Sequence, residues 1–319
     1  MRVIRDLSKS PFADGDDGRL RSVVTIGAYD GVHLGHQAII EEVRRNADEL
    51  GARSVVITFD RHPAEVVRPE SAPRLLTDLE QKLELLDATG IDATVLVRFD
   101  REQAAEQPAS FVSRVLVDCL HARRIVVGED FHFGSHRQGN VGLLRELGAA
   151  DDFDVEPLVL LPRQDGVDEP ISSTAIRRAL AGGEVERAGA MLGRPFQARG
   201  VVVQGDQRGR LLGFPTANVE VPNLVCLPAD GVYAGWYLLP DGERHPCAIN
   251  LGRRPTFYEH ADHSLLEAHL LDFSGDLYGQ HARVEFTHFL RSERKFEGID
   301  ALKAQLNHDI EHARSMLGD

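Results

Sequence analysis

The first half of the chain alternates short apolar runs with longer segments in which apolar residues recur at helical spacing. The runs predict buried strands, and the spaced residues predict helices that cover them. Thr77 and Glu80 form a capping-box pattern at the start of one such helix. This alternation predicts a doubly wound α/β domain with a parallel sheet, in which ligands bind at the carboxyl ends of the strands. The expected strands span residues 23–26, 55–59, 93–97, 124–127 and 155–161.

The pattern changes near residues 193–195. The segments beyond this point are short and strand-like, with Gly and Pro turns between them, which predicts a small antiparallel β-barrel or sheet. Apolar residues at helical spacing over 302–317 predict a C-terminal amphipathic helix. We therefore expect two domains, residues 1–186 and residues 187–319. The expected strands of the second domain span residues 198–203, 231–239, 248–250, 265–273 and 283–286.

A turn rich in glycine and histidine joins the first strand to the helix after it. Gly31 and Gly35 let the backbone approach a bulky anion. His33 and His36 lie at a helix N-terminus, where their rings can donate hydrogen bonds to phosphate. The alternatives are a zinc pair or ordinary polar histidines of a turn, but for zinc only Asp30 lies close by as a further ligand. The turn therefore favours a nucleotide phosphate over a metal ion.

Residues 205–218 form a second candidate site, because they combine glycines and arginines in a turn-rich run that suits phosphate. Thr216 and Asn218 alternate with Ala217 and so share one side of an extended segment. Their oxygens are ligands that suit Mg²⁺. On spacing alone, a glycine-rich hairpin followed by a plain strand explains these residues slightly better.

Composition limits the class of partner and the compartment. The net charge of −14 argues against a general nucleic-acid binder, whose affinity rests on a basic surface. The cysteines, Cys119, Cys226 and Cys247, are odd in number and widely spaced, which is typical of a reducing compartment. No apolar run has the length that spans a bilayer. We expect a cytoplasmic protein that binds small molecules, not nucleic acid or membrane, as a monomer or weak homo-oligomer.

Both candidate sites carry motifs of a known family. The first turn is similar to the H-x-G-H signature of nucleotidyltransferases, and the Gly-Phe-Pro-Thr-Ala-Asn run at 213–218 resembles the signature of riboflavin kinases. Over nearly its whole length the chain resembles the bifunctional bacterial riboflavin kinase/FAD synthetase family. It departs from the usual pattern at Ala28, Tyr29, Arg61 and Arg253. Further runs agree in order, at residues 58–60 and 62–63, 75–77, 127–131 and 133–134, 171–174 and 177, 254–257, 266–273 and 276–279.

The resemblance implies two reactions. The C-terminal domain would transfer the γ-phosphate of ATP to riboflavin and form FMN. The N-terminal domain, an FMN adenylyltransferase, would join FMN to the AMP of a second ATP, giving FAD and pyrophosphate. Both would use Mg²⁺. The resemblance assigns Glu267 as the base of the kinase, and His33 and His36 as catalytic residues of the adenylyltransferase.

The resemblance also implies three sets of binding residues and one metal site. In the first domain, ATP would bind Gly27, Asp30, His33, His36, Ser172, Ser173, Thr174 and Arg177. In the second domain, ATP would bind Gly205, Arg208, Gly209, Arg210, Gly213, Pro215, Thr216 and Asn218. The flavin would bind Asp60, His62, Pro63, Asp130, Phe131 and Arg254, and the metal would bind Thr216 and Asn218.

Several of these residues have a structural alternative. The hydroxyls at 172–174 can cap a helix without a ligand, and residues 60–63 fit a structural turn equally well. Phe131 fits a core position, and Asp130 fits a solvated one. Glu267 alternates with Leu266 and Ala268, which also fits a solvent-facing strand edge. For the whole chain, the alternatives are a kinase beside an inactive N-terminal domain, or a flavin-binding regulator. Retention of both nucleotide motifs argues against each of them.

Overall fold

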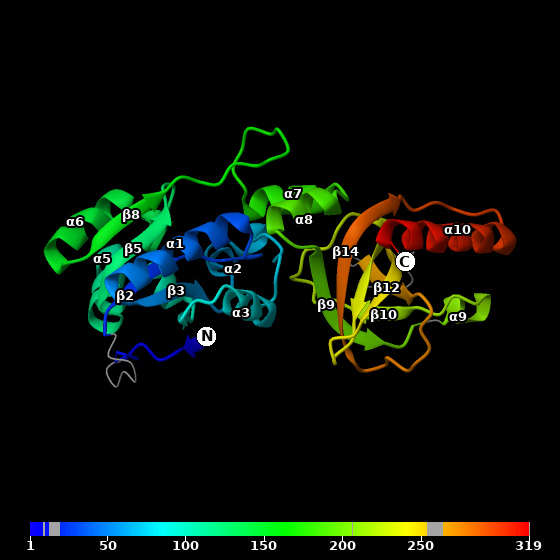
Figure 1. Ribbon diagram of the computed structural model, residues 1–319, viewed down its shortest axis with the longest axis horizontal. Coiled ribbons are helices and arrows are strands. Elements are labelled where there is room, and N and C mark those ends of the chain that lie inside the picture. Colours follow the sequence, from blue (N-terminus) through cyan, green and yellow to red (C-terminus); the bar gives the residue numbers. More distant parts are fainter. Residues whose placement is uncertain (9, 13–19, 206, 254–263, 319) are drawn as a thin grey trace. The chain divides into compact units, whose positions relative to one another are not determined.

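The chain folds into two compact units, Met1–Ser172 and Ser173–Asp319 (Figure 1). The computed structural model describes residues 1–8, 10–12, 20–205, 207–253 and 264–318.

A parallel sheet forms the centre of the first unit, as the alternation of apolar runs predicts. Among the described residues of this unit, six strands pair in the order β1-β4-β3-β2-β5-β8, and every pairing is parallel (Figure 1). The strand order reverses between β2 and β5, which places a ligand crevice at the carboxyl ends of the central strands. The strands are β1 (Arg2–Ile4), β2 (Ser22–Ile26), β3 (Arg53–Phe59), β4 (Ala93–Val97), β5 (Ala122–Gly128) and β8 (Asp154–Leu158).

Helices cover both faces of this sheet because its central strands β2, β3 and β4 are apolar on both sides. One apolar cluster joins residues such as Val24 and Val55 to η2 and α6, and a second joins Val23 and Val56 to α1 and α3. An apolar core thus lies on each face of the sheet, and the doubly wound prediction is confirmed. The elements around the sheet are α1 (Leu34–Leu50), α2 (Pro63–Val67), η1 (Pro69–Ser71), α3 (Leu79–Ala88), α4 (Arg101–Ala105), α5 (Pro108–Phe111), the π-helical η2 (Val112–Cys119), β6 (His132–Phe133), η3 (Ser135–Arg137), β7 (Gly139–Asn140) and α6 (Val141–Asp151).

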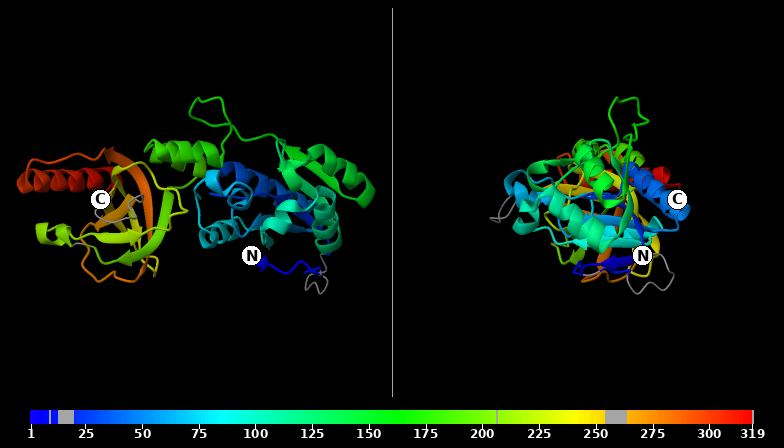
Figure 2. Two further views of the ribbon diagram at one scale, coloured as in Figure 1. Left: turned by 180° about the vertical axis from the view of Figure 1, so that it is seen from behind. Right: turned by 90° about the vertical axis from the view of Figure 1, so that its left-hand side faces the viewer.

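A closed antiparallel barrel forms the second unit, which confirms the predicted small barrel. The described strands close in the order β10-β13-β12-β11-β14-β9, around buried aromatic side chains such as Tyr233 and Phe286. The C-terminal helix α10 lies along the barrel in both views and packs against β11, β12 and β14 (Figures 1 and 2). The elements are α7 (Ser173–Ala181), α8 (Val185–Leu192), β9 (Phe196–Val203), α9 (Arg208–Leu212), β10 (Ala217–Glu220), β11 (Gly231–Leu238), β12 (Arg244–Arg253), β13 (Ser264–Leu270), β14 (His281–Arg291) and α10 (Ile299–Leu317).

The expected capping box at the start of α3 is wrong. Asp78 is the N-cap, and its carboxylate accepts the Gln81 N–H at 2.7 Å. Thr77 instead uses its hydroxyl to accept the Gly31 N–H at 3.1 Å. A contact across 46 residues thus overrides the local pattern, and it ties the turn after β2 to the segment that leads into α3.

Candidate active sites

The turn between β2 and α1 is wound through unusual backbone angles. Tyr29, Gly31 and Val32 all have positive φ, at 51°, 85° and 40°. For a bulky or β-branched residue this conformation is strained, and such strain persists where the surroundings impose it, often at functional sites. The turn ends at His33, the N-cap of α1, whose Nδ1 accepts the His36 N–H at 3.3 Å. The histidine motif therefore lies at a helix N-terminus, as the sequence predicts.

The two histidine rings stack on each other, with centroids 3.6 Å apart and planes inclined by 17°. The His36 ring also contacts the Tyr29 ring, and the centroids of these two rings are 4.8 Å apart. Burial lowers the pKa of His36 well below its usual value, and the neighbouring His33 and Lys82 lower it further. His36 is therefore a neutral imidazole near pH 7. Among the described residues its buried Nδ1 has no hydrogen-bond partner.

Asp30 points away from solvent and holds the turn in place. Its buried carboxylate accepts the N–H of Leu76 at 2.9 Å and that of Thr77 at 3.1 Å. This network fixes the turn against the segment before α3 and explains why a carboxylate is tolerated there. The role of Asp30 in ATP binding stays a prediction, and its geometry supports a structural role.

The predicted flavin residues after β3 also have local structural roles. Asp60 accepts the Phe99 N–H at 2.9 Å. His62 is the N-cap of α2, where its Nδ1 accepts the Ala64 N–H at 3.1 Å, and Pro63 is the first helical residue. Both the turn and the ligand interpretations therefore remain open. One cleft is lined by Asp30, Asp60 and His62 together with Ala28, Arg61, Leu75, Thr77, Leu79 and Lys82.

Two further predicted flavin residues follow β5, the strand next to β2. Phe131 is partly buried and stacks on Phe133 with centroids 5.5 Å apart, whereas Asp130 is exposed. Because β2, β3 and β5 are neighbours and parallel, all these turns lie at one edge of the sheet. The flavin role of Phe131 and Asp130 stays a prediction. Arg254 lies outside the described residues.

The Ser-Ser-Thr segment is divided between the two units. Ile171, just before it, brings its carbonyl oxygen against the histidine turn, 3.4 Å from where a Cβ at Gly35 would lie. Ser172 is the last residue of the first unit. Ser173, Thr174 and Arg177 lie on α7 of the second unit. Their roles in ATP binding stay predictions.

In the second unit, three polar side chains line up across adjacent strands of the barrel. Asn218 of β10 is paired in register with Glu267 of β13, which is in turn paired with Asn250 of β12. The Asn250 Nδ2 lies 3.4 Å from the Glu267 carboxylate. Their neighbours along each strand, such as Ala217 and Leu266, fill the interior. Because directly paired residues share a face, these three side chains form one polar cluster on the outer face.

Asn218 is buried although it lies on the outer face, because the loop after β9 covers it. A Cβ at Gly205 would lie only 2.5 Å from the Asn218 Nδ2, so only glycine leaves room for this amide. Among the described residues, the buried Asn218 Oδ1 has no hydrogen-bond partner. A buried amide oxygen without a partner is costly. It fits a hard cation, which uses such oxygens together with water and substrate phosphate.

A tight turn lies just before Thr216. The short helix α9 ends at Gly213, whose φ is 96°, and the chain folds back so that the Phe214 N–H donates to Gly209 O at 2.8 Å. The Thr216 Oγ1 then lies 3.6 Å from where a Cβ at Gly209 would stand. Pro215 presents its carbonyl oxygen to the His269 ring at 2.7 Å, and Arg210 is exposed. Gly209 thus lies close to Thr216 and Gly205 lies close to Asn218, and a metal site shared by Thr216 and Asn218 stays a prediction.

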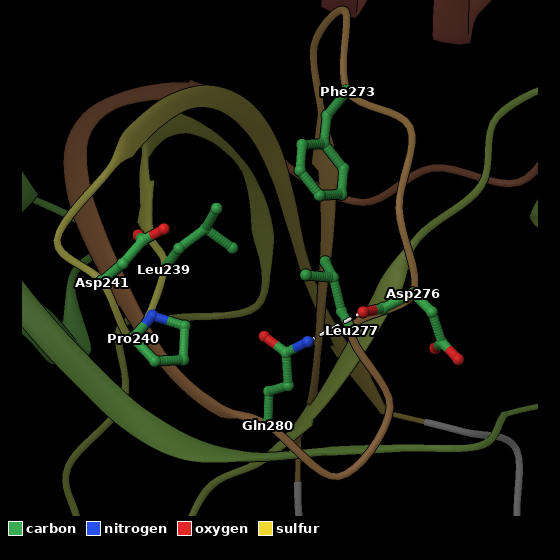
Figure 3. A pocket seen from close by; sticks show the side chains of 7 residues that line it. All are labelled: Leu239, Pro240, Asp241, Phe273, Asp276, Leu277 and Gln280. Atoms are coloured by element: carbon green, nitrogen blue, oxygen red, sulfur yellow. Dashed lines mark hydrogen bonds between the residues drawn. The ribbon is translucent and has the colours of Figure 1, made fainter.

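A hollow in the described part of the barrel lies away from these residues. It has a volume of about 450 Å³ between the β11–β12 hairpin and the loop from β13 to β14 (Figure 3). It is lined by Leu239, Pro240, Asp241, Phe273, Asp276, Leu277 and Gln280. No predicted kinase residue lines it. Asp272, in the same loop, forms an ion pair with Arg314 at 2.7 Å. Among Asp241, Asp272, Asp276 and Glu267, only Glu267 is paired in strand register with Asn218.

Sequence reasoning missed two residues of these sites. Asn250 lies on β12, and the register of β12 with β13 places it beside Glu267. Lys82 lies on the face of α3 that carries the partly buried Leu79 and the buried Leu86, and it is only 7% exposed. A lysine that interrupts an apolar helix face was the available signal for it.

Comparison with known proteins identifies the family. Residues 17–175 match the family model described as FAD synthetase, and residues 192–317 match the model described as riboflavin kinase. The chain belongs to the bifunctional riboflavin kinase/FMN adenylyltransferase family. It is 40% identical to the curated member from Haemophilus influenzae, over 92% of this chain and 93% of that protein. It is 39% identical to the member from Escherichia coli K12, over 100% of this chain and 97% of that protein.

A solved structure has the same fold over both units. It is a protein from Streptococcus pneumoniae described as a macrolide-efflux protein, with a TM-score of 0.83, 28% sequence identity and 98% of each chain covered. The family assignment rests on the sequence relatives, which are more similar to this chain and match it from end to end.

Proposed function

We propose that this chain makes FAD from riboflavin in two steps, at two separate sites. The barrel unit phosphorylates riboflavin with ATP and forms FMN. The first unit adenylylates FMN with a second ATP and releases pyrophosphate. The observation that carries this proposal is that each unit holds its own constellation of motif residues: the stacked His33 and His36 in one, and the paired Asn218 and Glu267 in the other.

The kinase step requires a base. A ribityl 5′-hydroxyl holds its proton near neutral pH, so the attacking oxygen becomes a good nucleophile only as that proton leaves. Glu267 accepts the proton while the hydroxyl oxygen attacks the γ-phosphorus, and the bond from that phosphorus to ADP breaks. Asn250 holds the Glu267 carboxylate in place by its hydrogen bond. The cluster thereby orients the base toward the polar site of Thr216 and Asn218.

The adenylylation step requires positioning and charge stabilisation but no base. The phosphate of FMN is already ionised near neutral pH. One of its oxygens attacks the α-phosphorus of ATP, and the bond to the departing pyrophosphate breaks. His33 and His36 at the N-terminus of α1 stabilise the charge that develops on the phosphates. Because His36 is neutral, it acts as a hydrogen-bonding group and can gain a proton only as negative charge accumulates beside it.

Mg²⁺ fits the kinase site. The buried, unpartnered Asn218 Oδ1 and the neighbouring Thr216 hydroxyl are the residues that would hold it. When bound, Mg²⁺ neutralises charge on the triphosphate. Among the described residues, no group of three or more His, Cys, Asp or Glu side chains could form an all-protein metal cage. A site completed by phosphate oxygens and water is consistent with that observation.

Replacing Asn218 by Ala is expected to weaken Mg²⁺-dependent FMN formation at least about 10-fold, equivalent to roughly 1.4 kcal/mol, because one oxygen ligand is lost. Titrating Mg²⁺ against FMN formation measures the effect. Adenylylation of supplied FMN should keep its normal Mg²⁺ dependence. An unchanged Mg²⁺ titration of the kinase would contradict the metal assignment, and Asn223→Ala, at an exposed position after β10, is the matched control.

We place the functional boundary of the kinase before α7. The sequence-based boundary at residues 186 and 187 falls inside α8, which packs against β9 and β14. The last turn of α7 also contacts the segment before β11, since the Ala229 N–H donates to Leu180 O at 2.9 Å.

A fragment of residues 173–319 is therefore expected to be more stable than one of residues 187–319. The shorter fragment loses the burial of Ile176 and Leu180, and burying one such side chain contributes roughly 1.5–3 kcal/mol. Urea denaturation of the two fragments checks this, together with their FMN formation. Equal stability would place the boundary at residue 187.

We place the enzyme in the cytoplasm, as a monomer or weak homo-oligomer that acts on small molecules and not on nucleic acid. The net charge of −14 and the buried free cysteines, Cys119, Cys226 and Cys247, support this assignment. Within the described ranges of the chain, no helix combines the length and the apolar character needed to cross a membrane.

Incubation of the whole protein with riboflavin, ATP and Mg²⁺, followed by chromatography of the flavins, tests the proposed function. FMN should appear first and FAD should follow. Tight flavin binding without any turnover would indicate a regulator, and FMN without FAD would indicate an inactive first unit.

A further inference from the structure

Lys82 is a buried lysine whose hydrogen bonds all go to the chain itself. Its side chain leaves α3 and reaches the carboxyl edge of the sheet, where the Nζ atom donates to Phe59 O at 2.8 Å and to Ala28 O at 3.3 Å. The Thr58 Oγ1 lies 3.4 Å from the same nitrogen. An ammonium group has three donors, and these three acceptors account for all of them.

The acceptors belong to the two turns that form the candidate adenylyltransferase site. Ala28 opens the turn that leads from β2 to the stacked histidines. Phe59 is the last residue of β3 and precedes the turn that holds Asp60 and His62. Thr58 adds a direct link, because its hydroxyl donates to Ala28 O at 3.0 Å. The ammonium therefore connects the ends of two neighbouring parallel strands at the floor of the cleft described above.

Charged groups face Lys82 from every side of this cleft. Carboxylates approach it from the turn after β2, from the end of β3 and from α2, through Asp30, Asp60 and Glu65. His36 of α1 faces it as well, since Lys82 contributes to lowering the pKa of that ring. Burial outweighs the attraction of the carboxylates and lowers the pKa of Lys82 to about 8. Arg61 and His62 complete the lining of the cleft.

A lysine at this position is not required for packing. Replacing a buried charged group by an apolar side chain of similar volume is often neutral for folding or stabilises it. Leu79 and Leu86 flank Lys82 on the same face of α3, so methionine would fit the same helix face. The position of the three bonded acceptors, all beside the histidine turn, points to a role in the site.

We propose that Lys82 is a positioning residue of the adenylyltransferase site: its ammonium holds the Ala28 and Phe59 carbonyl groups together and thereby fixes the turn that presents His33 and His36 to the phosphates. This inference rests on the proposed adenylylation activity. Lys82 would act through the turn and not on the substrate directly. It would do so only below its pKa, where the side chain is a protonated cation.

The consequence for pH dependence has a definite sign. Below about pH 8 Lys82 carries three donors and a positive charge, and above it the neutral amine has only two donors. Because folding lowers this pKa, the unfolded chain binds more protons than the folded chain between about pH 8 and the ordinary lysine pKa. The free energy of unfolding contributed by Lys82 therefore rises with pH. Loss of adenylylation above pH 8 is expected without loss of folding from this group.

Tyr29 and His36, the other groups at the turn with shifted pKa values, do not titrate in that range. Burial raises the pKa of Tyr29 further above its usual value, and His36 has already lost its proton well below pH 7. The FMN phosphate completes its ionisation near pH 6. A fall in the rate of adenylylation centred near pH 8 is thus assigned to Lys82.

The experiment compares Lys82→Met with Lys295→Met, which makes the same change at an exposed position of the barrel unit. FAD formation from supplied FMN and ATP is measured from pH 6.5 to about 9.5, and FMN formation from riboflavin is measured in the same samples. For Lys82→Met we expect kcat of adenylylation to fall by about 10²-fold, as for a misplaced catalytic group. The alkaline fall near pH 8 should disappear. The kinase, and both activities of Lys295→Met, should be unchanged.

Several results would overturn the inference. They are a wild-type adenylylation rate that stays level through pH 8, near-normal kcat in Lys82→Met, and an alkaline fall that persists in the variant. If Lys82→Met does not fold, Lys82→Arg decides, since a guanidinium keeps its charge and the alkaline fall should move above pH 9. Absence of FAD formation by the unmodified protein would contradict the proposed function instead.

Discussion

Replacing Glu267 by Gln is expected to reduce FMN formation by about 10²- to 10⁴-fold, the usual contribution of a general base. Glutamine keeps the shape of the side chain and can still contact Asn250, but it cannot accept the proton of the ribityl hydroxyl. The KM values for riboflavin and ATP should change little, because the lost interaction arises only in the transition state. Steady-state kinetics with chromatographic detection of FMN measures both quantities.

Glu220→Gln is the matched control for this prediction. Glu220 is exposed and lies on the same strand as Asn218, but it is paired with Val201 and not with Glu267. FAD formation from supplied FMN should be normal in both variants, because that nucleophile needs no base. A folded Glu267→Gln variant with near-normal kinase turnover would remove Glu267 from the mechanism. Asp276, in the hollow of Figure 3, would then be the next carboxylate to test.

Replacing His36 by Ala is expected to reduce FAD formation by about 10²- to 10³-fold, as when one donor that stabilises developing charge is removed. The stack with His33 is lost, and the N-terminus of α1 is left without its second imidazole. FMN formation should continue at the normal rate, because Glu267 and Asn218 lie in the other unit. Separate assays of the two products measure the effect.

The kinase activity of the same molecule is the internal control for His36→Ala, and His308→Ala on the exposed side of α10 controls for loss of a histidine as such. Circular dichroism checks the fold. If FMN and FAD formation decline in parallel while the fold is intact, the two sites are not independent, and the proposal of two separate reactions is wrong.

The architecture could be predicted from the sequence because its signals are local and repeated. Strands such as β3 are buried on both faces, so they are continuous apolar runs, and the barrel strands are short and separated by turn residues. The first and last residues of individual helices and strands could be predicted less well. β12 runs from Arg244 to Arg253, well beyond the expected 248–250, because its pairing partners β11 and β13 determine its length.

The candidate sites could be predicted only in part. The motifs locate the histidine turn, Asn218 and Glu267, because each is a short run of residues with a distinctive spacing. Contacts across long sequence distances could not be predicted. Asp30 binds backbone groups 46 residues away, and Lys82 contacts carbonyl groups 54 and 23 residues away. Such contacts leave no local pattern apart from a polar residue at an apolar position.

The central claim, that two separate sites act in sequence, is tested most directly by mixing the two inactive variants. Glu267→Gln alone should form almost no FAD from riboflavin because it lacks FMN, and His36→Ala alone should stop at FMN. Mixed in equal amounts with riboflavin, ATP and Mg²⁺, we expect them to restore FAD formation, since FMN made by one molecule is adenylylated by the other. If the mixture forms no FAD although each variant keeps its remaining activity, the claim is contradicted.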